Sequence, residues 1–168
     1  MEQIDKKKLL ITARQQLANG FVQEALRIYQ DILAIDPEYS QALHDLGMIQ
    51  FDAGNISEAI LLLKKTTQHD DKRPDFQNNF GTVLKASGDL AAAEKAFRKA
   101  LTLDRNLVPA LVNIGSLLIE RGRIPAALKA LKRAIELAPK NSTALSSYAE
   151  ANKALSLIHI SEPTRQKP

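Results

Sequence analysis

The sequence contains no cysteine among its 168 residues. Disulfide bonds, thiolate-bound metals and cysteine nucleophiles are therefore excluded. No apolar run approaches the ~20 residues that a membrane-spanning helix needs. The opening residues, MEQIDKKKLL, lack the long apolar core and the cleavage site of a secretory signal. Together these absences favour a cytoplasmic protein that does not bind membranes.

Aromatic residues and histidines are also scarce. The three tyrosines and five phenylalanines form no stacking platform in a basic stripe, which binding of single-stranded nucleic acid requires. The formal charge of +4 comes mostly from basic residues interleaved with acidic ones, so we interpret it as solvated surface charge. The histidines, His44, His69 and His159, have no second ligand at metal-binding spacing. We expect no nucleic-acid partner, no metal, no cofactor and no catalytic residue.

The few glycines that are present follow a period of 34 residues. They fall in two series, Gly20, Gly54, Gly88 and Gly122, and Gly47, Gly81 and Gly115. Alanines keep the same interval at Ala25, Ala59, Ala93 and Ala127, and large apolar residues keep it at Tyr29, Leu63, Phe97 and Leu131. A fixed period of this length is the signature of a repeat array. Since this pattern uses every glycine, none is left for a phosphate-binding loop.

Each repeat carries the signals of two helices. The first glycine series lies between two helical patterns, where a tight turn favours a residue that can adopt a positive φ. The second series lies inside the first helix, where glycine costs ~1 kcal/mol relative to alanine, so we expect another helix to approach closely there. One helix pair cannot bury both of its apolar stripes, and neighbouring pairs must therefore stack into a solenoid.

This pattern resembles the tetratricopeptide repeat (TPR). The resemblance is carried by L-x-x-L-G in the first helix, by alanine and a large apolar residue in the second, and by D-P before the next unit. Ala13 replaces the glycine of the first unit, while Asp71 and Arg105 replace the closing proline that Pro37 and Pro139 supply. The resemblance implies an all-α, right-handed superhelical solenoid of antiparallel helix pairs. We divide the array, residues 1–154, into repeats 6–39, 40–73, 74–107 and 108–141 and a partial fifth, 142–154.

The end of the sequence departs from the period. The stretch LSLIHISEPTR, Leu155 to Arg165, matches the in-frame translation of a transposase-tagging sequencing adapter; the alternative is a natural C-terminal extension. We interpret residues 155–168 as a non-native tail and expect the natural protein to continue beyond Ala154. The helix that contains Leu145 and Tyr148 would then lack a covering partner, so we expect it to fray or self-associate.

The function is expected in the concave surface of the solenoid. In each unit, positions 4, 7, 8 and 11 of the first helix face the second helix, and positions 2, 5, 6, 9, 12 and 13 point toward the groove. The sequence predicts an interaction module without enzymatic activity, which binds a peptide or protein segment in this groove. The predicted binding residues are Asp45, Met48, Phe51, Asn78, Asn79, Thr82, Lys85, Asn113, Ser116 and Ile119. We also expect Val112 to contribute to an apolar pocket.

Position 6 forms a column of Asp45, Asn79 and Asn113. This column resembles the asparagine ladder of O-linked N-acetylglucosamine transferases, in which amides bind the backbone of an extended peptide. An amide can pair with any main chain because it offers both a donor and an acceptor. The alternative is that these asparagines are merely tolerated at solvated helix positions.

Two family resemblances bear on the partner and on the whole protein. TPR domains that clamp the acidic C-terminus of heat-shock chaperones carry Lys, Asn and Arg at positions 5 and 9. Those positions here hold Leu10, Arg14, His44, Met48, Asn78 and Thr82. A lone arginine cannot clamp two carboxylates, which argues against such a partner. The alternative function is that residues 13–49 and 78–97, which are similar to the TPR region of some glycosyltransferases and sulfotransferases, belong to a fragment of such an enzyme.

Overall fold

The computed structural model describes the backbone of residues 5–161 and the side chains of residues 5–157. Within these residues the chain forms helices and turns and no strand. The helices are α1 (Lys6–Ala18), α2 (Val22–Ile35), α3 (Ser40–Asp52), α4 (Ile56–His69), α5 (Pro74–Ala86), α6 (Leu90–Leu103), α7 (Val108–Glu120), α8 (Ile124–Leu137) and α9 (Ser142–Ser161). The predicted all-α fold class is confirmed.

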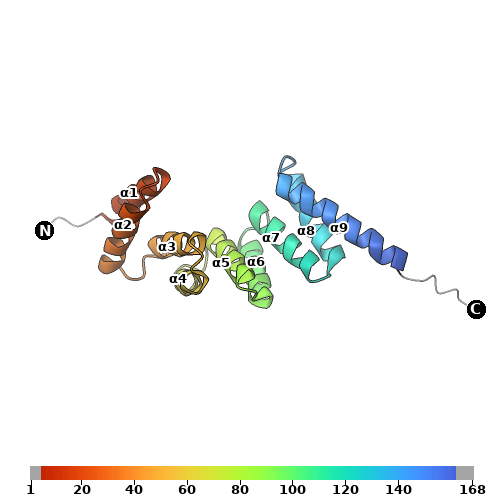
Figure 1. Ribbon diagram of the computed structural model, residues 1–168, viewed down its shortest axis with the longest axis horizontal. Helices are drawn as coiled ribbons and strands as arrows, with labels where there is room; N and C mark the ends of the chain where they lie inside the picture. Colours follow the sequence, from red (N-terminus) through yellow and green to blue (C-terminus); the bar gives the residue numbers. More distant parts are fainter. Residues whose placement is uncertain (1–4, 162–168) are drawn as a thin grey trace, which may run out of the picture.

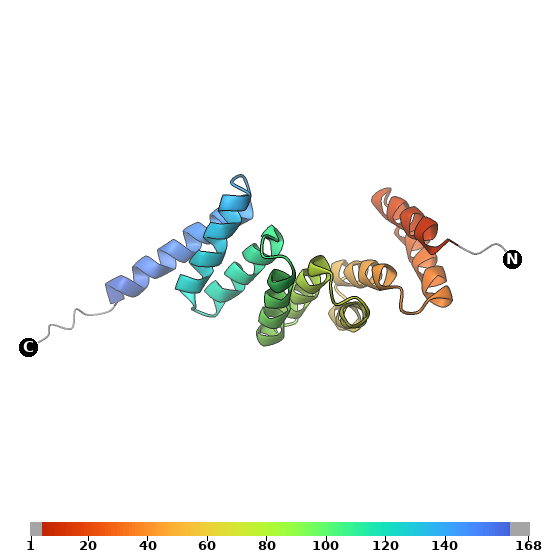
Figure 2. The same cartoon turned by 180° about the vertical axis from the view of Figure 1, so that it is seen from behind.

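The helices form antiparallel pairs that stack in chain order (Figures 1 and 2). Helices α1, α3, α5 and α7, here called the A helices, begin at residues 6, 40, 74 and 108, which are 34 residues apart. Each is followed by a B helix, α2, α4, α6 or α8. The described ends of the chain lie at opposite ends of the array (Figure 1). The predicted solenoid of helix pairs is therefore confirmed.

The turn within each pair requires glycine. Gly88 has a φ of +88°, and its N–H donates to the carbonyl of Lys85 while the N–H of Asp89 donates to that of Leu84. These bonds satisfy carbonyls that the end of α5 leaves without intrahelical partners. A side chain is strained at this φ, so only glycine makes the turn at little cost.

The glycine inside α3, α5 and α7 marks a close contact with the following B helix. A Cβ atom built at Gly81 would lie 2.7 Å from Cδ1 of Phe97, and one built at Gly115 would lie 2.6 Å from Cγ of Leu131. Phe97 and Leu131 are completely buried. The expected close approach of a second helix is confirmed, and it explains why a residue with poor helix propensity recurs there.

The core continues from one pair to the next. One cluster of buried residues draws on α5, α6, α7 and α8, and it includes Leu84, Ala93, Phe97, Leu117 and Ala127. Because neighbouring pairs share this apolar contact, each pair stabilises the next.

Helix α9 continues the stack on α7 and α8. Its Ala144 joins the cluster of Leu111 and Ala134, and its Ala151 joins that of Ile124 and Leu131. The repeat pattern departs from its period after Ala154, but the helix continues through residues 155–161. Residues 162–168 of the predicted tail lie outside the described part of the chain.

Candidate peptide-binding groove

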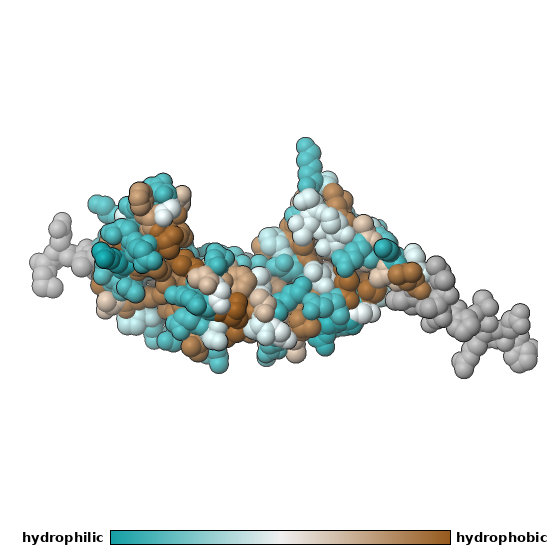
Figure 3. All heavy atoms as spheres, in the orientation of Figure 1, coloured by the Kyte–Doolittle hydropathy of each residue, from teal (hydrophilic) through white to brown (hydrophobic). Residues whose placement is uncertain are grey.

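The stack is bent in Figure 1, where α1 and the junction of α8 with α9 stand above the middle of the array. Figure 3 shows the surface hollowed between these two raised parts. Helix α3 lies nearer this hollow than its partner α4 in the same view. The face on which A helices meet is therefore the candidate binding surface.

A chain of side-chain hydrogen bonds links successive A helices across this stack. We call it the polar spine. Its members are Arg14 from α1, His44 and Asp45 from α3, Asn78 and Asn79 from α5, and Asn113 from α7. Three of the five hydrogen bonds join neighbouring A helices: α1 to α3, α3 to α5, and α5 to α7. The other two lie within α3 and within α5. The spine thus spans four repeats.

Asp45 is the acceptor at one end of the spine. Its Oδ2 accepts from Nε of Arg14 at 2.6 Å and from the hydroxyl of Tyr29 at 3.1 Å, and its Oδ1 lies 3.0 Å from Nδ1 of His44. Burial by itself raises the pKa of Asp45, but the hydrogen bonds from His44 and Arg14 outweigh it and hold the pKa below its ordinary value. Burial and the nearby carboxylate raise the pKa of Tyr29. Asp45 is therefore an ionised group that three side chains from α1, α2 and α3 hold in place.

His44 connects Asp45 to the asparagines. Because a carboxylate only accepts, the proton belongs on Nδ1 of His44, and Nε2 then accepts from Nδ2 of Asn79 at 2.9 Å. The imidazole stacks on Phe76, with ring centroids 4.4 Å apart and planes 20° apart. Stacking and two hydrogen bonds fix the orientation of the ring.

The asparagines extend the spine into α7. Nδ2 of Asn78 donates to Oδ1 of Asn79 at 3.2 Å, and Nδ2 of Asn113 donates to Oδ1 of Asn78 at 3.0 Å and lies 3.3 Å from Oγ1 of Thr82. An amide has two N–H donors and an oxygen with two lone pairs. Asn79 and Asn113 consequently keep hydrogen-bonding capacity for a ligand.

The other predicted residues are less uniformly placed. Nζ of Lys85 donates to Oγ of Ser116 at 3.1 Å and lies 3.5 Å from Oε2 of Glu120. Met48 and Phe51 are half-buried against the cluster of Ala59, Leu63 and Val83, and Ile119 is half-buried between α7 and α8. The side chains of these three predicted residues are thus partly committed to packing.

A cavity of about 320 Å³ lies where α1, α2 and α3 meet. Its lining residues are Arg14, Leu17, Ala18, Tyr29, Asp45, Met48, Ile49 and Asp52. Two predicted binding residues, Asp45 and Met48, therefore lie beside an opening large enough for a small apolar side chain.

The expected role of Val112 in a pocket is wrong. Its exposed fraction is 7%, and it packs in the cluster of Ala134 and Ala144, where α9 covers it. Asn78, at the same repeat position, is only 6% exposed. The reason is that the neighbouring A helix covers position 5, so this column lies between repeats rather than on the open face.

Arg14 and His44 were not predicted as functional partners of Asp45. A signal was available, because opposite charges at Arg14 and Asp45 occupy A-helix positions 9 and 6 of successive units. Which residues meet between repeats depends on the stacking angle, which the period does not give.

The described part of the chain contains neither a candidate metal site nor a candidate membrane-spanning helix. Among residues 5–157, no three His, Asp or Glu side chains are grouped so that they could hold a metal ion. Over the same described helices, none combines the length and the apolar character needed to cross a bilayer.

Solved structures share the architecture. The crystal structure of MamA protein matches with a TM-score of 0.80 at 22% identity, covering 92% of this chain and 85% of that one. YrrB, described as a TPR protein with an unusual peptide-binding site, matches with a TM-score of 0.76 at 20% identity, covering 92% and 84%. The first TPR of Spaghetti (RPAP3), bound to the HSP90 peptide SRMEEVD, matches with a TM-score of 0.69 at 25% identity, covering 72% and 96%.

Sequence comparison matches a family model but no individual curated protein. No curated protein sequence matches the chain significantly. The family model described as "Tetratricopeptide repeat" matches residues 16–78 and 84–155, which is most of the chain. With the stacked helix pairs and the glycine period, this match shows that the chain belongs to the tetratricopeptide repeat family.

Proposed function

We propose that the chain binds an extended peptide or protein segment along the A-helix face. The observation that carries this proposal is the polar spine, which holds two asparagine amides in fixed positions and leaves part of their hydrogen-bonding capacity unused. Groups that are already ordered lose little conformational entropy when a ligand binds. The RPAP3 domain, a solved neighbour at 25% identity, carries a bound peptide, and this supports a peptide as the ligand class.

In this proposal, Asn79 and Asn113 pair with the peptide backbone. Asn79 donates one N–H to His44 and retains another, and the carbonyl oxygen of Asn113 has no hydrogen-bond donor among the described residues. One asparagine thus offers a donor and the other offers an acceptor, which suits successive peptide groups. The cavity beside Met48 would take an apolar side chain of the same peptide.

We infer that the ligand is not a chaperone C-terminus held by a carboxylate clamp. Arg14 already donates to Asp45, and Lys85 lies 3.5 Å from Glu120. Both cations are therefore partly neutralised within the chain. The proposed recognition relies on backbone pairing, which tolerates varied side chains in the ligand.

A double variant, Asn79→Ala with Asn113→Ala, tests the proposal against a displayed peptide library. Loss of two amide pairs should weaken selected peptides by roughly tenfold or more, because each hydrogen bond contributes about 0.5–1.5 kcal/mol. Asn152→Ala, on the exposed face of α9, serves as the matched control. Thermal unfolding of each variant separates lost binding from lost stability. A binding profile unchanged in the double variant would remove the asparagines from the recognition site.

The enzyme-fragment alternative is a separate proposal. It is supported by the similarity of residues 13–49 and 78–97 to the TPR region of some glycosyltransferases and sulfotransferases. Genomic sequence beyond the codon for Ala154 tests it. A nucleotide-sugar or sulfate-donor domain would support the enzyme, and further repeats followed by a stop codon would contradict it.

A further inference from the structure

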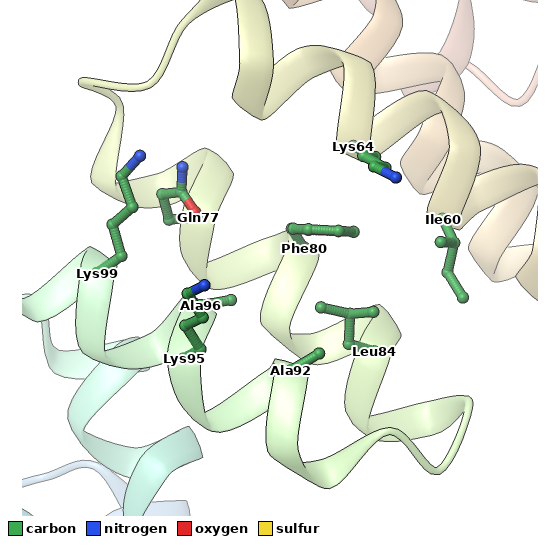
Figure 4. Close-up of a pocket in the computed structure, with 9 residues that line it drawn as sticks. All are labelled: Ile60, Lys64, Gln77, Phe80, Leu84, Ala92, Lys95, Ala96 and Lys99. Atoms are coloured by element: carbon green, nitrogen blue, oxygen red, sulfur yellow. The ribbon is translucent and has the colours of Figure 1, made fainter.

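A second cavity lies on the other side of the array, among the B helices. We call it the B-face cleft; its volume is about 380 Å³. The cleft is lined by Ile60 and Lys64 from α4, Gln77, Phe80 and Leu84 from α5, and Ala92, Lys95, Ala96 and Lys99 from α6 (Figure 4). None of these residues belongs to the polar spine or to the predicted groove, so the cleft is a distinct surface.

The floor of the cleft is apolar. Phe80 and Leu84 project from α5 between the two B helices, and Ile60 closes the side formed by α4 (Figure 4). Opposite them α6 presents Ala92 and Ala96, whose small side chains leave the space open. The volume lies in the range of small-ligand pockets, and an apolar side chain that enters it would be removed from water.

The rim of the cleft is positively charged. Lys64, Lys95 and Lys99 are all exposed, and Figure 4 shows Lys64 and Lys99 on opposite sides of Phe80. Lys99 has one acidic neighbour, Asp71, at 3.7 Å. In the described part of the chain, neither Lys64 nor Lys95 has a carboxylate within 4.0 Å. The opening therefore favours a ligand that carries negative charge.

The lining also contains one uncharged polar side chain, Gln77. Gln77 is 4% exposed, yet its side-chain amide makes no hydrogen bond to the described residues. Every fully enclosed polar side-chain atom in that part of the chain has a partner, so the amide of Gln77 retains some contact with solvent, and Gln77 is one of the residues that line the cleft. The amide has no protein partner among the described residues, so it is available to pair with a ligand backbone in the cleft.

We propose that the B-face cleft binds an acidic segment of a partner protein, which inserts a leucine or phenylalanine side chain. The apolar floor selects the inserted side chain, the three lysines select acidic flanks, and Gln77 pairs with the backbone of the segment. This recognition uses a face that the proposed groove leaves free, so one chain would hold two partners at once.

A phage library of random dodecapeptides tests the proposal, with the whole chain as bait. The selected peptides should combine a leucine or phenylalanine with acidic flanks. Charge reversal at two rim positions, Lys95→Glu with Lys99→Glu, should weaken those peptides by at least ~10-fold. The matched control is Lys129→Glu with Lys132→Glu, a pair exposed on α8 outside the cleft, which should leave their affinity unchanged.

A second variant removes only the amide. Gln77→Leu should weaken the selected peptides several-fold without lowering the melting temperature, because Leu111 occupies the same repeat position one unit later. The Asn79→Ala with Asn113→Ala variant should still bind them, which separates this cleft from the proposed groove. Failure to select acidic apolar peptides, or equal binding by the rim variant and its control, would overturn the proposal.

Discussion

Two consecutive junctions between repeats differ although their backbones follow the same pattern. Between α4, α5 and α6, Ile60 helps to line an open apolar cleft. One repeat later, between α6, α7 and α8, the equivalent residue is Glu94, 34 positions along the chain. Its carboxylate is held by three arginines, Arg98, Arg121 and Arg123.

The charged junction is a compact cluster around one acidic side chain. Oε1 of Glu94 accepts from Nη2 of Arg98 and from Nη1 of Arg123, both at 2.8 Å, and Oε2 accepts from Nη1 of Arg121 at 2.7 Å. The hydrogen bond from Arg98 lowers the pKa of Glu94 more than burial raises it, and the other arginines add to the effect. Ser87 and Asp89 occupy the places of Arg121 and Arg123 one repeat earlier. A single repeat position can thus become either an ionic link or part of a binding surface, because the fold fixes only the backbone.

The largest effect on stability is expected at the buried alanines, which both junctions share. Ala93→Leu and Ala127→Leu each force extra volume into one shared, fully buried cluster. We expect each to lower the free energy of unfolding by about 1–3 kcal/mol, measured by urea denaturation. Unequal costs would mean that the junctions already differ in their buried packing and not only at their surfaces.

Ile60→Glu introduces a carboxylate at the junction that lacks the equivalents of Arg121 and Arg123. The new charge would face Ser87 and Asp89 and would replace apolar contact with the core, so we expect a loss of about 2 kcal/mol. Leu61→Glu, at a residue 57% exposed, should change stability by less than about 0.5 kcal/mol. If both variants unfold at the same urea concentration, Ile60 does not contribute to the junction as described.

Glu94→Ile makes the reverse exchange. The three arginine side chains are 54%, 39% and 50% exposed, and water therefore screens them once the carboxylate is gone. We expect a cost of only about 1 kcal/mol in unfolding free energy. A loss of 3 kcal/mol or more would indicate that the cluster behaves as a fully buried ion network.

The smallest effect is expected in the pH dependence of unfolding. The folded chain lowers the pKa of Glu94, so this group stabilises the fold above its ordinary pKa of about 4.3, and the stabilisation is lost as the pH falls through the lower folded value. Denaturation at pH 7 and at successively lower pH should therefore show a shallower decline for Glu94→Gln than for the parent chain. Ile60→Gln, the matched variant at the other junction, should leave the slope unchanged.

The fold was predictable because its strongest signals are local. Gly88 indicates a turn with a positive φ, and Gly81 indicates a close helix contact, here with Phe97. Each of these features depends only on the immediate surroundings of the glycine. The site was predictable only in outline. Val112 was expected at the groove because the period gives helical faces, whereas its burial depends on how α9 covers α7.

The B-face cleft was not predicted, because it depends on a combination of residues from three helices. Its alanines, Ala92 and Ala96, have equivalents in Ala126 and Ala130, so small residues alone do not mark it. The informative difference is between Ile60 and Glu94 at one repeat position. Aligning the repeats with each other, rather than using only their shared pattern, would have drawn attention to it. The repeat boundaries and the groove residues stay predictions.

Four of the five hydrogen bonds of the polar spine run in one direction, from α7 toward Asp45, while Arg14 donates to Asp45 from the other side. Asn113 donates to Asn78, Asn78 to Asn79, Asn79 to His44, and His44 to Asp45. Aligned bonds of this kind polarise and strengthen one another. Among the described residues no donor reaches the side-chain carbonyl of Asn113, and a ligand donor there would add to a line of dipoles that terminates on a carboxylate two repeats away, so that contact at one repeat would strengthen the hydrogen bonds between the repeats before it.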